Sequence, residues 1–290
     1  MEEFEYLSPA NLPQLLRYLS SPGGHIISGG TDLIPKLRSG SVKVSTVIDI
    51  SRVEELRFIR EENEWIHIGA RTTYADVLSS PILARHAPVL VEATHLVASP
   101  MARARGTIGG NIGNASPAGD SIPPLLVLEA EATLLNPAGE RILPLEKLIT
   151  GPMKTALTAD EVIHHISFHK PPANRGFGFE KLGPRQGMTI SIATAAAAIE
   201  LDQEQAISIA RIAVGAVAPT PIRCKTAEKL LLGRQPVEET WKLAAEAVLK
   251  LIAPINDVRA TADYRRKASG VLVERALRAA AEMAARSAQP

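Results

Sequence analysis

The sequence predicts an α+β protein of about two domains, and three observations support that prediction. The chain has 290 residues, which is roughly twice the length of an average domain. Segments that alternate like β-strands are mixed with segments whose apolar residues recur at helical spacing. The composition also changes at residues 170–174 (Lys-Pro-Pro-Ala-Asn), which are the best candidate for a linker.

The N-terminal segment is expected to contain a helix followed by two short strands. Ser8 and Pro9 form a helix-start signal, since serine caps a helix and proline fits its first turn. The apolar face of this helix consists of Leu12, Leu15, Leu16 and Leu19. Strands are expected at residues 25–28 and 46–50, with a helical turn at 33–37 between them.

The middle segment is expected to combine a strand, several helices and a hairpin. Alternation at residues 65–69 predicts a strand, and residues 106–120 are expected to form a long glycine-rich loop. Helices are expected at residues 73–78, 88–97 and 124–128. Asn-Pro-Ala-Gly at 136–139 is typical of a hairpin turn, and it lies between candidate strands at 131–135 and 141–143.

The C-terminal segment is expected to contain two long strands and two amphipathic helices. Residues 190–201 and 206–217 resemble strands joined by a turn. The alanine run at 195–198 fits a helix as well, but the β-branched residues on either side favour a strand. Two helical stripes follow, formed by Trp241, Ala244, Val248, Leu251 and Ile252 and by Leu272, Ala276, Ala279 and Met283.

Charge and composition exclude several classes of function. The net charge is +1, so the chain lacks a strong general field for nucleic acid. No apolar run approaches the roughly 20 residues of a membrane helix. The start, Met-Glu-Glu-Phe-Glu, is acidic and does not resemble a targeting signal, so a cytoplasmic protein is expected. Cys224 is the only cysteine, and one thiolate cannot hold an iron–sulfur cluster. A redox centre in this chain would therefore be organic.

Two glycine-rich stretches are the candidate binding elements. Gly29-Gly30-Thr31-Asp32 follows a predicted strand, where glycines let backbone amides approach phosphate oxygens. A tight strand-to-helix turn explains the same glycines. The loop at 106–120 is richer in small donors, and Asp120 could accept a hydrogen bond from a ribose hydroxyl. Neither stretch has the Rossmann or P-loop spacing. Two separate glycine stretches therefore indicate a long ligand clamped between lobes.

Four stretches resemble the FAD-binding medium subunit of the molybdenum hydroxylases, the family of xanthine dehydrogenase and carbon monoxide dehydrogenase. They are SGGTDL at 28–33, GTIGGNI at 106–112 with SPAGD at 116–120, KLGPR at 181–185 and GAVAPTPIR at 215–223. Residues 257–266 add a weaker fifth stretch. The matches follow the family's order and cover nearly the whole chain.

The resemblance implies a fold and a set of FAD contacts. An FAD-binding module of the vanillyl-alcohol-oxidase-like type would have lobes at 1–52 and 53–173, followed by a C-terminal α/β domain of the CO dehydrogenase flavoprotein type at 174–290. The implied contacts are Ile27, Ser28, Gly29, Gly30, Thr31, Asp32, Leu33, Thr107, Ile108, Gly109, Gly110, Asn111, Ser116, Asp120, Ile163, Lys181 and Ile190. Lys181 would approach the flavin ring, where a cation tunes its potential. The family often has an acidic residue and an aromatic residue where this chain has Thr189 and Ile190.

The resemblance also implies an electron relay. A molybdopterin large subunit would hydroxylate the substrate, an iron–sulfur small subunit would carry single electrons to the FAD, and NAD+ or another acceptor would receive them. The complex is expected to be a dimer of heterotrimers. Two alternatives stay open: a stand-alone FAD-dependent oxidase or dehydrogenase, and a scaffold that has lost its cofactor.

The histidines and the cysteine give no clear catalytic or metal site. On a regular strand His165 and His169 share a face and His164 points away, and no well-spaced carboxylate joins them. A solvated or edge-strand role is expected for these histidines.

Cys224 lies between Arg223 and Lys225, which could lower its pKa. The preferred interpretation is a small, semi-buried residue. His25, before the first glycine stretch, is a candidate for covalent flavin attachment.

Overall fold

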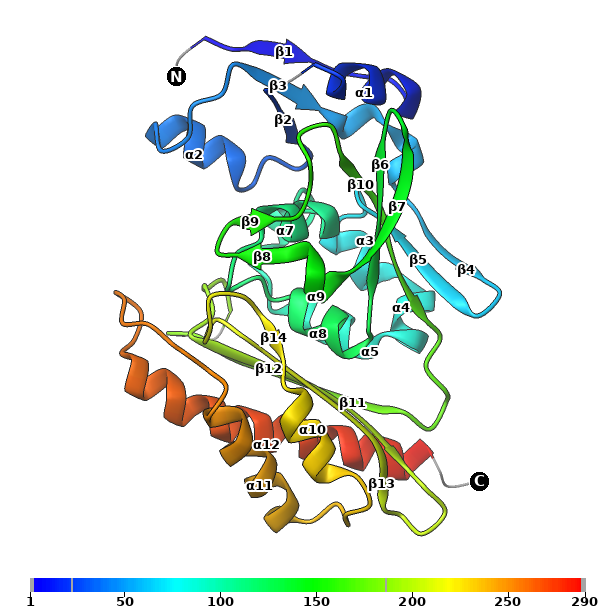
Figure 1. The fold of residues 1–290 in the computed structure, drawn as a ribbon, viewed down its shortest axis with the longest axis vertical. Coiled ribbons are helices and arrows are strands. Elements are labelled where there is room, and N and C mark those ends of the chain that lie inside the picture. The colour runs from blue at the N-terminus through cyan, green and yellow to red at the C-terminus, as the bar shows by residue number, and fades with distance from the viewer. Residues whose placement is uncertain (1–2, 22, 186, 288–290) are drawn as a thin grey trace. The chain divides into compact units, whose positions relative to one another are not determined.

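The computed structural model describes residues 3–21, 23–185 and 187–287; Met1 and Glu2 of the acidic start lie outside these ranges. The chain divides into two compact units, each built from several segments. Unit 1 consists of Met1–Ile82, Ser99–Ala115 and Ala130–His169. Unit 2 consists of Leu83–Ala98, Ser116–Glu129 and Lys170–Pro290. Both contain helices and strands, so the predicted mixed class is confirmed (Figure 1).

Unit 1 contains three sheets. A parallel sheet has the order β1-β3-β2, with β1 at Glu5–Leu7, β2 at Gly24–Ile27 and β3 at Thr46–Asp49. An antiparallel sheet has the order β4-β5-β10-β6-β7, with β4 at Ile59–Glu62, β5 at Trp65–Gly69, β6 at Glu131–Asn136, β7 at Gly139–Pro144 and β10 at Val162–His169. The short pair β8 (Ile149–Gly151) and β9 (Lys154–Thr155) forms the third.

Short helices connect and cover these sheets. They are α1 (Leu12–Leu19), α2 (Leu33–Ser39), α3 (Tyr74–Ser79), α6 (Pro100–Arg103), α7 (Ile108–Asn114) and α9 (Leu145–Leu148), with 3-10 turns at Ile50–Arg52 and Glu54–Leu56. Helix α4 (Pro81–His86) spans the border between the units. The core beside the parallel sheet is apolar and includes Leu15, Leu19, Ile48 and Val53. The leucine face predicted for the first helix is thus confirmed.

The start of that first helix was predicted too early. Helix α1 begins at Leu12, and Asn11, not Ser8, caps it: the Asn11 Oδ1 atom accepts from Gln14 N at 3.0 Å. An asparagine side chain one residue before the first turn satisfies an orphan amide as well as serine does. Residues 5–7, which precede the cap, pair with β3 as a parallel strand that the sequence pattern did not reveal.

Unit 2 is a four-stranded antiparallel sheet with helices on both faces (Figure 1). Its strand order is β11-β12-β13-β14, with β11 at Gly176–Leu182, β12 at Ala193–Leu201, β13 at Ile207–Gly215 and β14 at Ile222–Arg223. Its helices are α5 (Pro88–His95), α8 (Ile122–Val127), α10 (Lys225–Leu231), α11 (Glu238–Leu249) and α12 (Ala262–Ser287). Helices α5 and α8 contact the strands from one face, and α10 and α12 contact them from the other.

The alanine run at 195–198 lies in β12, so the strand interpretation is confirmed. All four alanines are buried. Ala195 and Ala197 belong to the core shared with α10, α11 and α12, whereas Ala196 and Ala198 are buried on the opposite face. Small side chains suit this position because α12 runs very close to the sheet. A Cβ atom on Gly178 would lie 2.2 Å from the carbonyl oxygen of Ala276 in α12.

Within the described residues, every helix is too short or too polar to cross a bilayer.

Candidate functional site

The first glycine stretch forms the turn between β2 and α2 in unit 1. Gly30 has φ +71°, a left-handed conformation that side chains with a Cβ rarely adopt. The carbonyl of Gly30 accepts from Ile34 N at 3.1 Å, which fixes the turn against the first residues of α2. Gly29 is a glycine for a different reason. A Cβ atom there would lie 1.8 Å from the carbonyl oxygen of Arg105, so the two backbones are in direct contact.

The second glycine stretch is not the long loop that was predicted. Residues 108–114 form the helix α7, which Thr107 caps by accepting from Gly110 N at 3.1 Å. Ala115 ends the helix in a left-handed conformation with φ 47°. Glycine and asparagine disfavour helices in isolation. Here tertiary contacts override that preference, since Gly109 N donates to the carbonyl of Ala70 at 2.9 Å.

The glycines of α7 divide between two faces. Gly109 is buried, and a Cβ atom there would lie 2.6 Å from the Cβ of Ala70. Gly110 and Gly113 are exposed; a Cβ on Gly113 would meet nothing within 4 Å, and a Cβ on Gly110 would meet only the Oγ1 atom of the cap residue Thr107, at 2.8 Å. Gly109 is therefore needed for packing in unit 1. Gly110 and Gly113 instead leave an open surface without side chains, which another molecule can approach closely.

The structure brings the two stretches together within unit 1. Besides the contact between Gly29 and Arg105, the Nζ atom of Lys36 in α2 donates to Asn114 Oδ1 in α7 at 2.9 Å. The same ammonium group pairs with Asp32 at 2.6 Å. Between Gly29 and Asp32, the backbone amides have no hydrogen-bond acceptor among the described residues. Unpaired amides beside a side-chain-free surface fit a negatively charged, phosphate-bearing ligand.

In unit 2, three of the polar side chains of interest form one buried cluster. Lys181 Nζ lies 2.6 Å from Asp120 Oδ2 and donates to the carbonyl of Leu96 at 2.9 Å. The hydroxyl of Ser191 donates to the other Asp120 oxygen at 2.5 Å. Burial raises the pKa of the Asp120 carboxyl, and the ammonium group of Lys181 opposes that rise. Asp120 and Lys181 are thus each other's partners, a pairing that sequence reasoning did not foresee.

The remaining predicted residues occupy different environments. Ile163 is 5% exposed and pairs with Leu134 of β6, and Ser116 Oγ accepts from Ala118 N at 3.3 Å. Ile190 is 64% exposed, and the hydroxyl of Thr189 donates to its carbonyl at 2.9 Å. Of these residues, Ile190 alone presents a large apolar side chain to the surface.

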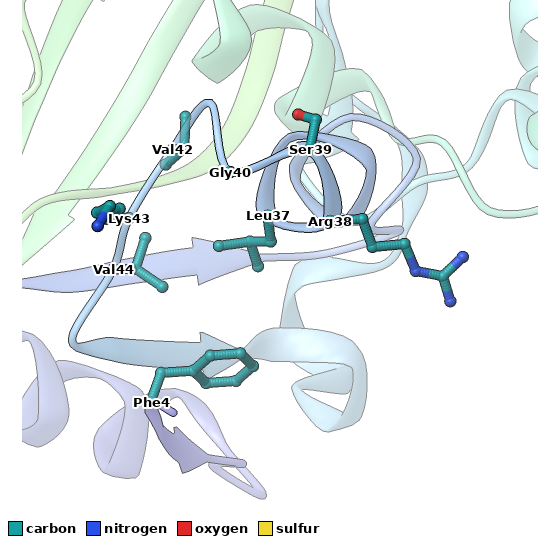
Figure 2. A pocket seen from close by; sticks show the side chains of 8 residues that line it. All are labelled: Phe4, Leu37, Arg38, Ser39, Gly40, Val42, Lys43 and Val44. Atoms are coloured by element: carbon teal, nitrogen blue, oxygen red, sulfur yellow. The ribbon is translucent and has the colours of Figure 1, made fainter. Parts of the chain in front are cut away.

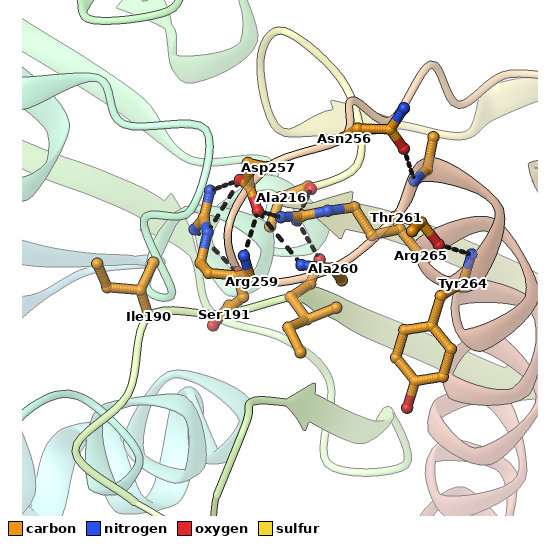
Figure 3. Close-up of polar contacts among 12 residues, drawn as sticks. Ile190, Ser191, Ala216, Asn256, Asp257, Arg259, Ala260, Thr261, Tyr264 and Arg265 are labelled. Atoms are coloured by element: carbon orange, nitrogen blue, oxygen red, sulfur yellow. Dashed lines mark hydrogen bonds and ion pairs between the residues drawn. The ribbon is translucent and has the colours of Figure 1, made fainter.

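A second polar cluster in unit 2 lies around Asp257 (Figure 3). Hydrogen bonds from Arg259 and Arg265 hold the pKa of the Asp257 carboxyl well below its usual range, and the bond from Arg259 has the larger effect. Arg259 also reaches the carbonyl of Ser191 at 3.2 Å. The sequence marked this segment only as a weak family stretch. Arg259 bonds Ser191, 68 residues earlier in the chain, and Arg265 bonds Ile192, 73 residues earlier, and no local pattern reveals such partners.

The histidine interpretation was wrong in two respects. Strand β10 lies in the middle of its sheet, between β5 and β6, so it is not an edge strand. A register shift between Ile163 and His165 also places His164 beside His165, with their Nδ1 atoms 2.7 Å apart. The ring of His67 lies edge-on to His165 at a centroid distance of 5.0 Å. Even so, no group of three or more histidine, cysteine or acidic side chains in residues 3–21, 23–185 and 187–287 is arranged for a metal ion.

These histidines predict a pH dependence of stability. Burial lowers the pKa of His165 to about 4, and it also lowers the pKa values of His164 and His67. As pH falls below the unfolded value of about 6.5, the unfolded chain takes up protons first, so stability is lost between about pH 6.5 and 4. We expect His165→Gln to reduce that loss by about 1–2 kcal/mol, allowing for partial exposure.

Urea unfolding at a series of pH values measures this effect. His25→Gln is the matched control, because His25 is an exposed histidine on β2. If the free energy of unfolding falls by the same amount in wild type and in His165→Gln between about pH 6.5 and 4, the assignment to His165 is contradicted.

Cys224 is fully buried at the start of α10, and burial raises its pKa to about 12. Cys224 was predicted to be semi-buried and is in fact fully buried, and its raised pKa favours the protonated thiol over a nucleophilic thiolate.

A separate cavity of about 240 Å³ lies beside the C-terminal end of α2 (Figure 2). Its lining includes Phe4, Leu37, Arg38 and Lys43. None of the predicted cofactor residues lines it, so it is distinct from the glycine stretches.

Comparisons with known proteins identify the two halves of the chain. Residues 2–171 match the family described as the FAD binding domain in molybdopterin dehydrogenase. Residues 179–280 match the CO dehydrogenase flavoprotein C-terminal domain. Together the two matches span nearly all of the sequence.

Full-length relatives agree with these matches. The chain is similar to the carbon monoxide dehydrogenase medium chain of Hydrogenophaga pseudoflava, with 35% identity over 280 residues and 96% of each chain covered. It is also similar to the putative xanthine dehydrogenase FAD-binding subunit of Escherichia coli K12, with 34% identity and 90% of each chain covered.

A solved structure extends the similarity to three dimensions. It is carbon monoxide dehydrogenase from Hydrogenophaga pseudoflava lacking the Mo-pyranopterin moiety of its cofactor; the TM-score is 0.94, with 97% of this chain and 98% of the other covered. The side-chain-free surface in unit 1 and both family matches therefore agree with the resemblance found in the sequence. The chain belongs to the FAD-binding medium subunits of the molybdenum hydroxylases, which are oxidoreductase subunits related to carbon monoxide dehydrogenase and xanthine dehydrogenase.

Proposed function

We propose that the two glycine stretches of unit 1 hold the pyrophosphate and ribityl portions of FAD. The observation that carries this proposal is the meeting of the two stretches, with unpaired amides between Gly29 and Asp32 and exposed glycines at Gly110 and Gly113. Amides bind phosphate oxygens without side-chain entropy loss, and a surface without side chains allows close approach. The contacting residues would be Ile27, Ser28, Gly29, Gly30, Thr31, Asp32, Leu33, Thr107, Ile108, Gly109, Gly110 and Asn111.

Gly109 differs from the other residues of that set because it packs inward, against Ala70. Its amide is bonded to Ala70, and its Cα faces the interior of unit 1. We propose that it acts by letting α7 pack against Ala70, which places Gly110 and Asn111 on the open side. Its role toward FAD is therefore positional.

For unit 2, we propose that Lys181 supplies positive charge to the flavin ring and that Asp120 holds Lys181. Asp120 retains lone pairs beyond those used by Lys181 and Ser191, so it can still accept from a ribose hydroxyl. Ser116 and Ile190 of unit 2 and Ile163 of unit 1 complete the proposed contacts. A bound flavin supplies two-electron redox chemistry that one-electron carriers can feed, and this chain tunes it through charge near the ring.

The wider function follows from the family. We propose that an iron–sulfur subunit delivers electrons to this subunit, that a molybdopterin subunit oxidises the substrate, and that NAD+ or another acceptor takes the electrons. We further propose a dimer of heterotrimers in the cytoplasm, and a division of the chain into functional domains at 1–52, 53–173 and 174–290.

Anaerobic reduction with and without partner subunits tests this function. We expect the purified chain to bind FAD in a 1:1 ratio and to leave the flavin oxidised when organic substrates are added. Co-expressed with its iron–sulfur and molybdopterin partners, the same flavin should bleach when the substrate of the complex is added. Bleaching of the isolated subunit would favour a stand-alone dehydrogenase, and a colourless preparation that takes up no added FAD would favour a scaffold.

A further inference from the structure

Asp257 lies at the centre of an ionic cluster that crosses unit 2 (Figure 3). Its Oδ2 atom accepts from Arg259 Nη2 at 2.5 Å and from Arg259 Nε at 3.0 Å. Its Oδ1 atom accepts from Arg265 Nη2 at 2.7 Å. One carboxylate therefore holds two guanidinium groups in fixed orientations, which is the geometry that forked arginine donors favour.

Both guanidinium groups also donate to backbone carbonyls next to the sheet, although the buried Nε of Arg265 has no hydrogen-bond partner among the described residues. Arg259 Nη1 donates to the carbonyl of Ser191 at 3.2 Å. Arg265 Nη1 donates to the carbonyl of Ile192 at 2.7 Å and to that of Ala216 at 3.0 Å. Ser191 and Ile192 directly follow the exposed Ile190. The cluster thus fixes the backbone at the point where the chain enters the sheet.

Burial makes this arrangement rigid. The Arg265 side chain is 1% exposed, whereas those of Asp257 and Arg259 are 20% and 28% exposed. A buried guanidinium needs an ionised partner, because leaving it unpaired is strongly unfavourable. Asp257 therefore serves the folding of unit 2 through Arg265. Asp257 also orients Arg259, which donates to the carbonyl of Ser191.

Ser191 links this cluster to the buried pair of Asp120 and Lys181. Its side chain is fully buried, and its hydroxyl donates to Asp120 Oδ1 while Lys181 binds Oδ2. A continuous path of hydrogen bonds thus runs from Asp257 through Arg259, Ser191 and Asp120 to Lys181. Every member after Arg259 is less than one tenth exposed, so water competes weakly for these bonds.

We infer that Arg259 and Asp257 are positioning residues for Lys181: they hold Ser191 in place, and Ser191 orients the carboxylate that holds the ammonium group. This inference rests on the proposed function for its consequence, that a well-placed Lys181 raises the potential of the bound flavin. The position of Lys181 itself depends only on contacts within unit 2.

Trace acetylation with acetic anhydride, read by peptide mass spectrometry, tests the position of Lys181 without any flavin. The variants are Arg259→Gln, which leaves Arg265 paired, and Ser191→Ala, which removes the hydroxyl. We expect Lys181 acetylation in FAD-free protein to rise roughly tenfold in both, since each loses one charge-assisted bond of the path. Lys36, on α2 in unit 1, serves as the internal reference in the same digest.

Two controls separate positioning from general loosening. Arg278→Gln removes an exposed ion pair between α12 and Glu238, and Lys181 acetylation should stay at the wild-type level. Ser191→Thr keeps the hydroxyl and should restore most of the protection. Asp257→Asn is less informative, because an unpaired Arg265 can prevent folding. Unchanged Lys181 acetylation in both Arg259→Gln and Ser191→Ala, with folding intact, would overturn the inference.

The flavin readout uses the FAD-loaded subunit and keeps the two proposals distinguishable. If Lys181 acts on the flavin, Arg259→Gln should lower the midpoint potential by about 30 mV, the equivalent of tenfold for a two-electron couple. Increased acetylation with an unchanged potential would support the positioning path and contradict the proposed role of Lys181 at the flavin. A change in both would support the two together.

Discussion

Gly30→Val is expected to remove FAD from the protein, whereas the same substitution at Gly40 is expected to leave a full complement. Both glycines have φ +71°, so valine suffers the same backbone strain at each position. We expect each variant to lose about 1–2 kcal/mol of stability from that strain. Gly40 ends α2 with nothing within 4 Å of an added Cβ. At Gly30 an added Cβ would lie 3.1 Å from Ile34 Cγ1 and 3.3 Å from Ile27 Cδ1, so the turn must shift, which would move the unpaired amides away from the proposed phosphate contacts.

The measurement is the FAD released per chain after acid precipitation, with urea unfolding run in parallel on both variants. We expect less than about a tenth of the wild-type FAD in Gly30→Val, a loss that corresponds to more than about 1.4 kcal/mol of binding free energy. Full FAD retention in Gly30→Val would refute the assignment of this turn. Gly109→Val is a poor substitute, because its clash with Ala70 would disrupt unit 1 whether or not FAD binds there.

Lys181→Met is expected to destabilise the chain by about 3–5 kcal/mol, because it leaves the Asp120 carboxylate buried without its partner. Lys181 and Asp120 are only 5% and 9% exposed. The double variant Asp120→Asn/Lys181→Met should recover most of that loss. An asparagine can still accept from Ser191, and the double variant leaves no unpaired charge in the buried cluster.

Chemical unfolding of wild type, both single variants and the double variant gives the coupling energy of the pair. Simple additivity of the two single effects would show that the ion pair is not what stabilises this cluster. The recovered double variant also offers a folded protein without the Lys181 charge, in which FAD binding can be compared with wild type.

Segments whose residues follow an alternating or turn-forming pattern were mostly predicted correctly from the sequence. The hairpin at 131–143, the strand at 65–69 and the alanine-rich strand are all present as β6–β7, β5 and β12. Strands β1 and β4 were missed because their residues are largely exposed and polar, as in Ile-Arg-Glu-Glu at 59–62. Helix α7 was missed because its glycines and asparagines disfavour a helix locally, whereas its first turn is anchored by hydrogen bonds to the distant residues Ala70 and Thr72.

The site was predictable where residues form motifs and unpredictable where partners are distant in sequence. The two glycine stretches were found from composition, yet composition could not separate Gly109, which packs inward, from Gly110, which is open. The pairing of Asp120 with Lys181 joins residues 61 positions apart, and both had been assigned separately to FAD. Side-chain roles depend on such pairings, which form only when the sheet of unit 2 is assembled.

The interrupted order of segments in unit 2 constrains how this chain can be synthesised and divided. Helices α5 and α8 contribute one covering layer of the C-terminal sheet, yet they are encoded before residue 130. A fragment starting at residue 174 would therefore expose Ala196 and Ala198 of β12 to water and leave the sheet open to self-association. During translation α5 and α8 emerge well before the strands they cover, so unit 2 can mature only after the C-terminal third is made, whereas every segment of unit 1 has been translated by His169.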